Sequence, residues 1–98
     1  MSVYTLGIWT VRPGREDDFE VGWRRLAERT QADHPQATAV LLRDRDRPGT
    51  YISFGPWDSV EQITEWRGSP AFQESVTAIR ELLENFERHT MDPIVEVG

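Results

Sequence analysis

The side chains that could do chemistry are few, and none of them forms a recognisable catalytic set. The two histidines, His34 and His89, are about fifty residues apart and have no carboxylate at helix spacing, which makes a weak case for a metal site. His34 lies beside Pro35 in a predicted loop, and His89 is expected to complement the charge at the end of a helix. The absence of cysteine excludes disulfides, thiolate metal sites and cysteine nucleophiles. No triad or phosphate-binding loop is present either, so neither a metal nor a nucleotide cofactor is predicted.

The composition limits the class of protein. The chain has 98 residues, of which 38% are hydrophobic and 10% aromatic, and this predicts one globular domain over residues 1–98. The formal net charge of −6 argues against nucleic acid or an anionic membrane as a partner, because phosphate groups would repel this surface. No run of residues is apolar enough to cross a membrane, and Met1 leads directly into a strand-like pattern without a signal sequence. These features predict a cytoplasmic protein.

Hydrophobic periodicity predicts the elements that must position any site. Strands are expected over residues 3–11, 37–44, 50–57 and 92–97. Helices are expected over 14–31, over a short segment that contains Val60, Ile63 and Trp66 and ends at Gly68, and from Pro70 to near His89. Asp58 with Glu61, or alternatively Ser59 with Gln62, fits a capping box for the short second helix. Ser69 and Pro70 are typical of the start of the third, whose apolar stripe contains Phe72, Val76, Ile79, Leu83 and Phe86. This order predicts an α+β fold of the ferredoxin-like split βαβ type, with a four-stranded antiparallel sheet and helices on one face.

Both faces of the predicted sheet are apolar. Side chains alternate along a strand, so one face receives Tyr4, Leu6, Ile8, Ile52 and Phe54, while Trp9, Tyr51, Ser53 and Trp57 lie on the other. Helices in so short a chain can cover only one face. Burial of each large apolar side chain on the remaining face contributes roughly 1.5–3 kcal/mol. A homodimer through Tyr4, Leu6, Ile8, Ile52 and Phe54 is therefore predicted, the alternative being a long loop or terminus that covers them.

Several segments of the chain resemble the antibiotic biosynthesis monooxygenase (ABM) family of dimeric α/β barrels. They are the first strand running into VRPGREDDFE, the hairpin that ends in YISFGPWDSVEQITEW, and GSPAF at the start of the next helix. The most specific parts are Trp57-Asp58-Ser59, Trp66, and Ser69-Pro70 followed by Phe72. The resemblance implies the dimeric α/β barrel fold. Its members include cofactor-independent oxygenases of polycyclic quinol precursors, haem-degrading enzymes, quinol oxidases and isomerases.

The resemblance also implies a pocket between the sheet and the helices, with Trp57 facing it. Parity places Tyr51, Ser53 and Gly55 on the same side, with Gly7 opposite, and the small residues among them leave volume for a flat aromatic ligand. The residues predicted to contact this substrate are Gly7, Trp9, Trp23, Tyr51, Trp66, Phe72 and Val76. The alternative is that the aromatic residues only pack the core.

Differences from the family pattern reduce the number of activities that the resemblance implies. Haem-degrading members carry an asparagine and a histidine where this chain has Gly7 and Val76, so haem degradation is not expected. Anthrone-oxygenase members carry an asparagine at the position of Ser53, and here Trp57 is retained. Trp57 can donate a hydrogen bond and Ser53 can donate and accept, so these two are the predicted catalytic residues of a small oxyanion site. The resulting hypothesis is a cofactor-independent monooxygenase acting on a small aromatic quinol or polycyclic substrate with dioxygen. The alternative is a non-catalytic dimeric module that binds a small molecule or mediates assembly.

Overall fold

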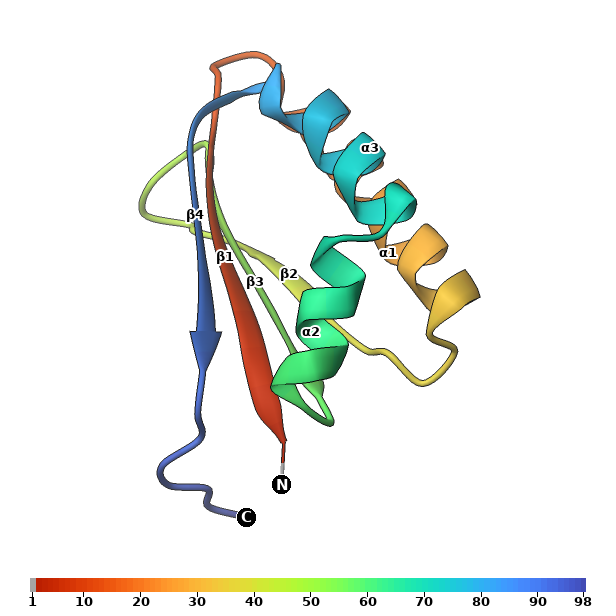
Figure 1. Ribbon diagram of the computed structural model, residues 1–98. Helices are drawn as coiled ribbons and strands as arrows, with labels where there is room; N and C mark the ends of the chain where they lie inside the picture. The colour runs from red at the N-terminus through yellow and green to blue at the C-terminus, as the bar shows by residue number, and fades with distance from the viewer. Residues whose placement is uncertain (1) are drawn as a thin grey trace.

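A four-stranded sheet carries all three helices on one of its sides (Figure 1). The computed structural model describes residues 2–98. Its elements are β1 (Val3–Val11), α1 (Glu16–Asp33), β2 (Val40–Arg43), β3 (Thr50–Trp57), α2 (Val60–Arg67), α3 (Pro70–Arg80) and β4 (Leu83–Met91). The paired strands are antiparallel, and their order across the sheet is β2-β3-β1-β4. The predicted α+β, ferredoxin-like fold is confirmed.

Local sequence signals explain where α2 and α3 begin. The side chain of Ser59 accepts a hydrogen bond from the backbone N–H of Gln62 at 3.1 Å, so the second of the two predicted capping pairs is the one that forms. Ser69 accepts from the backbone N–H of Phe72 at 3.2 Å, and Pro70 occupies the first turn, where its missing N–H costs nothing. Both helices therefore start at the residues that the sequence indicates.

The core lies between the helices and the inner face of the sheet. Strand alternation turns Trp9 and Val11 of β1, and Tyr51 and Trp57 of β3, toward the helices, where all four are buried. The helices contribute Phe19 and Leu26 from α1, Ile63 from α2, and Ala71, Phe72, Val76 and Ile79 from α3. No helix within residues 2–98 combines the length and apolar character that a membrane span requires.

The C-terminal part of the chain differs from the prediction. Helix α3 ends at Arg80 and is followed by β4, whereas the spacing of Leu83 and Phe86 predicted a helix to near His89. Strand β4 pairs with β1 from Tyr4 to Val11, which supplies hydrogen-bond partners for that edge of β1 and overrides the helical pattern. The strand predicted over residues 92–97 is wrong, because residues 92–98 have no regular structure and the side chain of Ile94 is 87% exposed.

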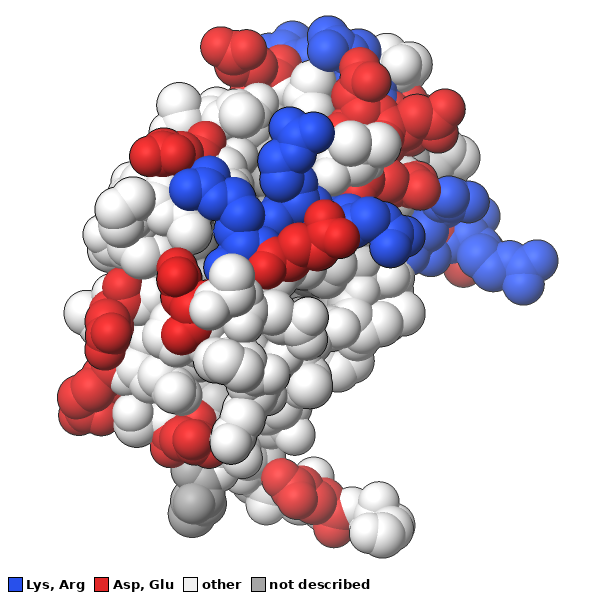
Figure 2. Space-filling view, turned by 90° about the vertical axis from the view of Figure 1, so that its right-hand side faces the viewer, with Lys and Arg blue, Asp and Glu red and all other residues white. Residues whose placement is uncertain are grey.

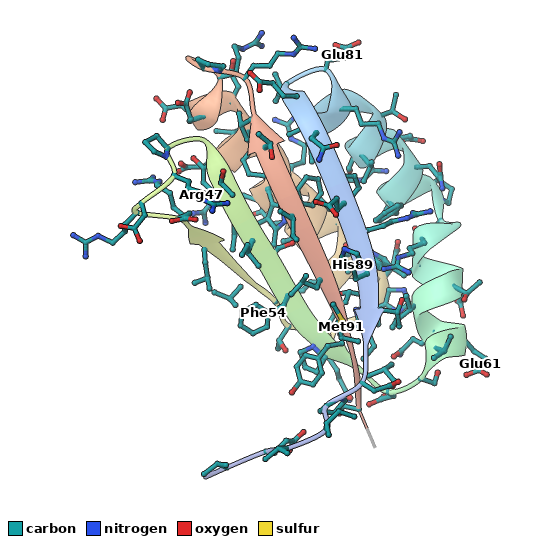
Figure 3. All side chains as sticks on the ribbon, turned by 90° about the vertical axis from the view of Figure 1, so that its left-hand side faces the viewer. Arg47, Phe54, Glu61, Glu81, His89 and Met91 are labelled. Carbon is teal, nitrogen blue, oxygen red and sulfur yellow. The ribbon has the colours of Figure 1, made fainter. Side chains whose placement is uncertain are left out.

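The outer face of the sheet lies opposite the helices and carries apolar side chains (Figure 3). Four of the five predicted interface residues, namely Tyr4, Leu6, Ile8 and Ile52, are half-buried in the single chain, and Phe54 is 38% exposed. The register adds Val40 and Leu42 of β2 beside Phe54 and Ile52, and both are exposed. The apolar surface thus extends from β1 across β3 to β2.

Candidate functional site

A cavity of about 590 Å³ lies between the inner face of the sheet and α1. Six of the seven residues predicted to contact a substrate line it, namely Gly7, Trp9, Trp23, Tyr51, Trp66 and Phe72, and so do the two predicted catalytic residues, Ser53 and Trp57. All four tryptophans of the chain are among them. Val76 is different, because it lies in the core at 5% exposure and is not part of the cavity wall. The sheet and α1 thus bring together residues that are far apart in the sequence.

Gly7 makes room for a hydrogen bond on the cavity floor. The indole Nε1–H of Trp9 donates to Ser53 Oγ at 2.9 Å, and a Cβ on Gly7 would lie 2.8 Å from that nitrogen and 2.9 Å from that oxygen. The ring of Trp9 is held from the other side by Phe86, stacked with the ring centroids 4.1 Å apart. Because Ser53 accepts from Trp9, the proton of its own hydroxyl remains able to donate to a ligand oxygen.

Gly55 does not enlarge the cavity, although the sequence predicted that it would leave volume for a ligand. A Cβ at this position would collide with the carbonyl oxygen of Thr38 and with Ala39. The absence of a side chain at Gly55 therefore lets the segment before β2 cross close to β3, and it adds no volume to the cavity.

Trp57 stands in an aromatic cluster at the cavity wall. Its Nε1–H donates to Thr5 Oγ1 at 3.3 Å, which is long for a hydrogen bond. Its ring lies 4.9 Å from the ring of Trp66 and meets the ring of His34 edge-on at 5.3 Å. Ser53 and Trp57 therefore both reach the cavity, but each is held by its own protein partner, and no hydrogen bond joins them in the described chain.

The other two tryptophans, Trp66 and Trp23, differ in whether the indole N–H has a hydrogen-bond partner in the protein. Trp66 donates to Thr30 Oγ1 at 2.9 Å, and Thr30 donates in turn to the carbonyl of Leu26 at 2.8 Å, so this indole is fixed to α1. Trp23 is half-buried at the cavity wall, and its N–H has no hydrogen-bond partner within residues 2–98. Trp23 is therefore a hydrogen-bond donor that a ligand can use without breaking an existing contact.

A polar cluster that the sequence reasoning missed closes one part of the cavity wall. The hydroxyl of Tyr51 donates to Glu20 Oε2 at 2.6 Å, and Arg43 donates to the same oxygen at 2.9 Å. These hydrogen bonds, that of Tyr51 first, lower the pKa of Glu20. Burial and the bond to Glu20 raise the pKa of Tyr51. The pair is therefore an ionised carboxylate and a neutral phenol at neutral pH. The sequence does hold one indication of this cluster, since Tyr51 was predicted to lie on the inner face of the sheet and a buried tyrosine hydroxyl needs a hydrogen-bond partner.

Neither histidine lies in the cavity wall. His34 follows α1 and its ring contacts the ring of Trp57, while His89 lies in β4, 3.8 Å from the carboxylate of Glu87. The expectation that His89 ends a helix is wrong, because that residue lies in a strand. Residues 2–98 contain no group of three or more metal-ligating side chains placed to hold an ion.

The comparisons with known proteins agree with this fold. Residues 3–78 match the family described as antibiotic biosynthesis monooxygenase, and the chain belongs to that family. It is similar in structure to SnoaB of Streptomyces nogalater, a cofactor-independent oxygenase, with a TM-score of 0.85 and 25% sequence identity over 98% of this chain and 96% of that one.

Two further solved structures share the fold at lower identity. Rv0793 of Mycobacterium tuberculosis has a TM-score of 0.83 and 20% identity, with all of both chains covered. A conserved protein of Methanosarcina mazei Go1 has a TM-score of 0.82 and 15% identity over 92% of this chain and 90% of that one. Among curated proteins, no match was found.

Proposed function

We propose that this protein is a cofactor-independent monooxygenase that oxidises a small aromatic quinol or polycyclic substrate with dioxygen. The observation that carries the proposal is the cavity lined by four tryptophans, with the Ser53 hydroxyl on its floor. The likeness to SnoaB, which is a cofactor-independent oxygenase, supports the same reaction class. A flat ring system matches such a cavity, because aromatic rings pack well against indoles.

The reaction of such an enzyme needs little from the protein. In a substrate of the anthrone type, a ring methylene becomes a carbonyl, one oxygen atom of dioxygen enters the product, and the other leaves as water. All four electrons come from the substrate, so no reductant is required. The protein must exclude water, hold the ring and stabilise the oxyanion that forms when the substrate loses a proton.

Ser53 and Trp57 are the residues assigned to that oxyanion. The Ser53 hydroxyl keeps a free proton because it accepts from Trp9, and the long hydrogen bond from Trp57 to Thr5 is weak enough to be exchanged for a ligand oxygen. The pKa of Glu20 is lowered, so this carboxylate is a weak base, and the substrate proton is expected to leave to solvent through the open side of the cavity.

We also propose that the active form is a homodimer joined through the outer face of the sheet. Tyr4, Leu6, Ile8, Ile52 and Phe54 form the centre of this interface. Phe54 is 38% exposed in the single chain, and the exposed Val40 and Leu42 continue the same apolar surface. A contiguous apolar surface of this kind on a small soluble domain is typical of an interaction site.

Oxygen uptake with a hydroxyanthrone tests the enzymatic proposal. Trp57→Phe keeps an aromatic ring and removes the N–H, and loss of one oxyanion donor typically lowers the rate by about 100-fold or more. Trp66→Phe is the matched comparison, because it makes the same replacement in the cavity wall but removes an N–H that is held by a shorter hydrogen bond to Thr30, at 2.9 Å against 3.3 Å for Trp57 to Thr5. The rate is expected to fall less in Trp66→Phe than in Trp57→Phe, and the rate of Ser53→Ala is expected to fall as far as that of Trp57→Phe.

The second candidate is a dimeric module that binds an aromatic molecule without turning it over. The observation that favours it is that Ser53 and Trp57 already have protein partners and that no histidine lines the cavity. Uptake no faster than the blank, or equal rates in wild type and in Trp57→Phe, would favour this candidate.

A further inference from the structure

The charge of the cavity is opposite to that of the chain. The protein has a formal net charge of −6, yet the cavity wall contains four arginines, Arg24, Arg43, Arg67 and Arg88, against two glutamates, Glu20 and Glu28. The one ion pair among these residues joins Arg43 to Glu20. In residues 2–98, no carboxylate lies within salt-bridge distance of the other three arginines. On the side of the molecule that bears the helices, arginine side chains gather near the middle of the face, with acidic ones among them (Figure 2).

Arg67 and Arg88 approach the cavity from two different elements. Arg67 ends α2, and its guanidinium donates to Thr90 Oγ1 at 3.0 Å and to the backbone carbonyl of His89 at 3.3 Å. These neutral acceptors hold the guanidinium against β4 without cancelling its charge. Burial, and after it the positive charge of Arg88, lowers the pKa of Arg67. Two uncompensated cations are thus close enough to repel each other, an arrangement that a bound anion would relieve.

The sheet register places Arg88 next to the proposed oxyanion site. Gly7 of β1 pairs with Ser53 of β3 on one side and with Arg88 of β4 on the other. Arg88 is two residues after Phe86, which stacks on Trp9, so both side chains belong to the inner face. The row across the cavity floor therefore runs from a hydroxyl, past a residue without a side chain, to a guanidinium.

We propose that the cavity binds an aromatic ligand that carries a carboxylate, with the carboxylate held by Arg67 and Arg88 and the rings packed against the tryptophans. This inference rests on the proposed function and specifies its substrate class as an aromatic acid. Guanidinium groups pair with carboxylates through two parallel hydrogen bonds and keep their charge at any physiological pH. The Arg67 and Arg88 pair is a specificity element, because it contacts the acid group and leaves the reacting ring to Ser53 and Trp57.

Binding of two matched probes tests the inference without turnover. All four tryptophans line the cavity, so quenching of their emission reports occupancy directly. Anthraquinone-2-carboxylate and anthraquinone-2-carboxamide have the same ring system and differ in charge. The carboxylate is expected to bind about ten-fold more tightly or better at low ionic strength, and added sodium chloride should reduce this preference.

Variants that remove one positive charge show which arginines cause the preference for the carboxylate probe. Arg88→Gln is the main variant, because in the described chain the Arg88 side chain makes no hydrogen bond whose loss would disturb the fold. It is expected to weaken carboxylate binding about ten-fold and to leave carboxamide binding unchanged. Arg67→Gln should do the same, with circular dichroism to check folding, since it also loses two hydrogen bonds. Arg25→Gln is the control, because Arg25 is exposed on α1 and is not part of the cavity wall.

Three results would overturn the inference: equal affinity of the wild type for both probes, no binding of either, or a preference that survives in Arg88→Gln. Its failure is distinguishable from failure of the proposed function. Equal binding of both probes together with rapid oxygen uptake would contradict the proposed carboxylate site and support the monooxygenase. Selective binding of the carboxylate without oxygen uptake would contradict the monooxygenase and support the carboxylate site.

Discussion

Gly7→Ala is the substitution whose cost the structure defines most closely. The added methyl group would lie 2.8 Å from Trp9 Nε1 and 2.9 Å from Ser53 Oγ, well inside ordinary contact distance. The hydrogen bond between those two atoms must therefore lengthen or break. Both partners are held, Trp9 by the stacked ring of Phe86 and Ser53 by its strand, so neither can move away freely.

The magnitude follows from three effects. Loss of the hydrogen bond costs about 1 kcal/mol, and forcing a methyl group into a filled site costs roughly 1–3 kcal/mol. Replacing glycine by alanine stabilises the fold by about 0.4–1 kcal/mol, because it lowers the conformational entropy of the unfolded chain. The net loss of about 2 kcal/mol is large for a domain of typical stability, and each kcal/mol lowers the melting temperature by about 4–8 °C.

Thermal unfolding followed by circular dichroism measures this loss. Gly68→Ala is the matched control, because a Cβ there would meet its nearest neighbour, the carbonyl oxygen of Thr64, at 3.5 Å, an ordinary contact. The double variant Gly7→Ala with Ser53→Ala should lose about 1 kcal/mol less than the sum of the single variants, because the same hydrogen bond is lost only once. A wild-type melting temperature for Gly7→Ala, or simple additivity in the double variant, would show that a methyl group at Gly7 does not disturb the Trp9–Ser53 hydrogen bond.

Three other predictions test separate parts of the structure. Leu6→Arg places a charge at the centre of the outer sheet face and should give monomeric or insoluble protein, and a well-folded dimer by size exclusion with light scattering would contradict the proposed interface. The lowered pKa of Glu20 stabilises the fold above the unfolded-state pKa, and this stabilisation is lost as the pH falls through the folded-state pKa. The difference in urea midpoint between wild type and Glu20→Gln should therefore be present at pH 7 and should disappear as the pH falls through the folded-state pKa of Glu20, and a pH-independent difference would count against the ion pair. Ser69→Ala removes the cap of α3 and should cost about 1 kcal/mol by urea denaturation, whereas Ser69→Asp should recover most of it.

Several parts of the candidate site could be predicted from strand parity alone. Trp9, Tyr51, Ser53 and Trp57 share the inner face because alternate residues of a strand point the same way, and their strands were recognisable from composition. The hydrogen-bond partners of these residues could not be predicted. Trp9 contacts Ser53 across 44 positions of sequence, and only the strand register decides which side chains stand opposite each other.

The sequence by itself determined the α+β class, the first three strands of the sheet, the capped starts of α2 and α3, and the two apolar faces of the sheet. These features depend on local periodicity and on residues within one turn of each other, so they can be recognised from the sequence alone. The tertiary structure alone decided that Leu83–Met91 is a strand, because the open edge of β1 requires a partner whatever the local preference of that segment. It also decided which charges face the cavity, since Glu20, Arg43, Arg67 and Arg88 come from four different elements and meet only when the helices pack on the sheet.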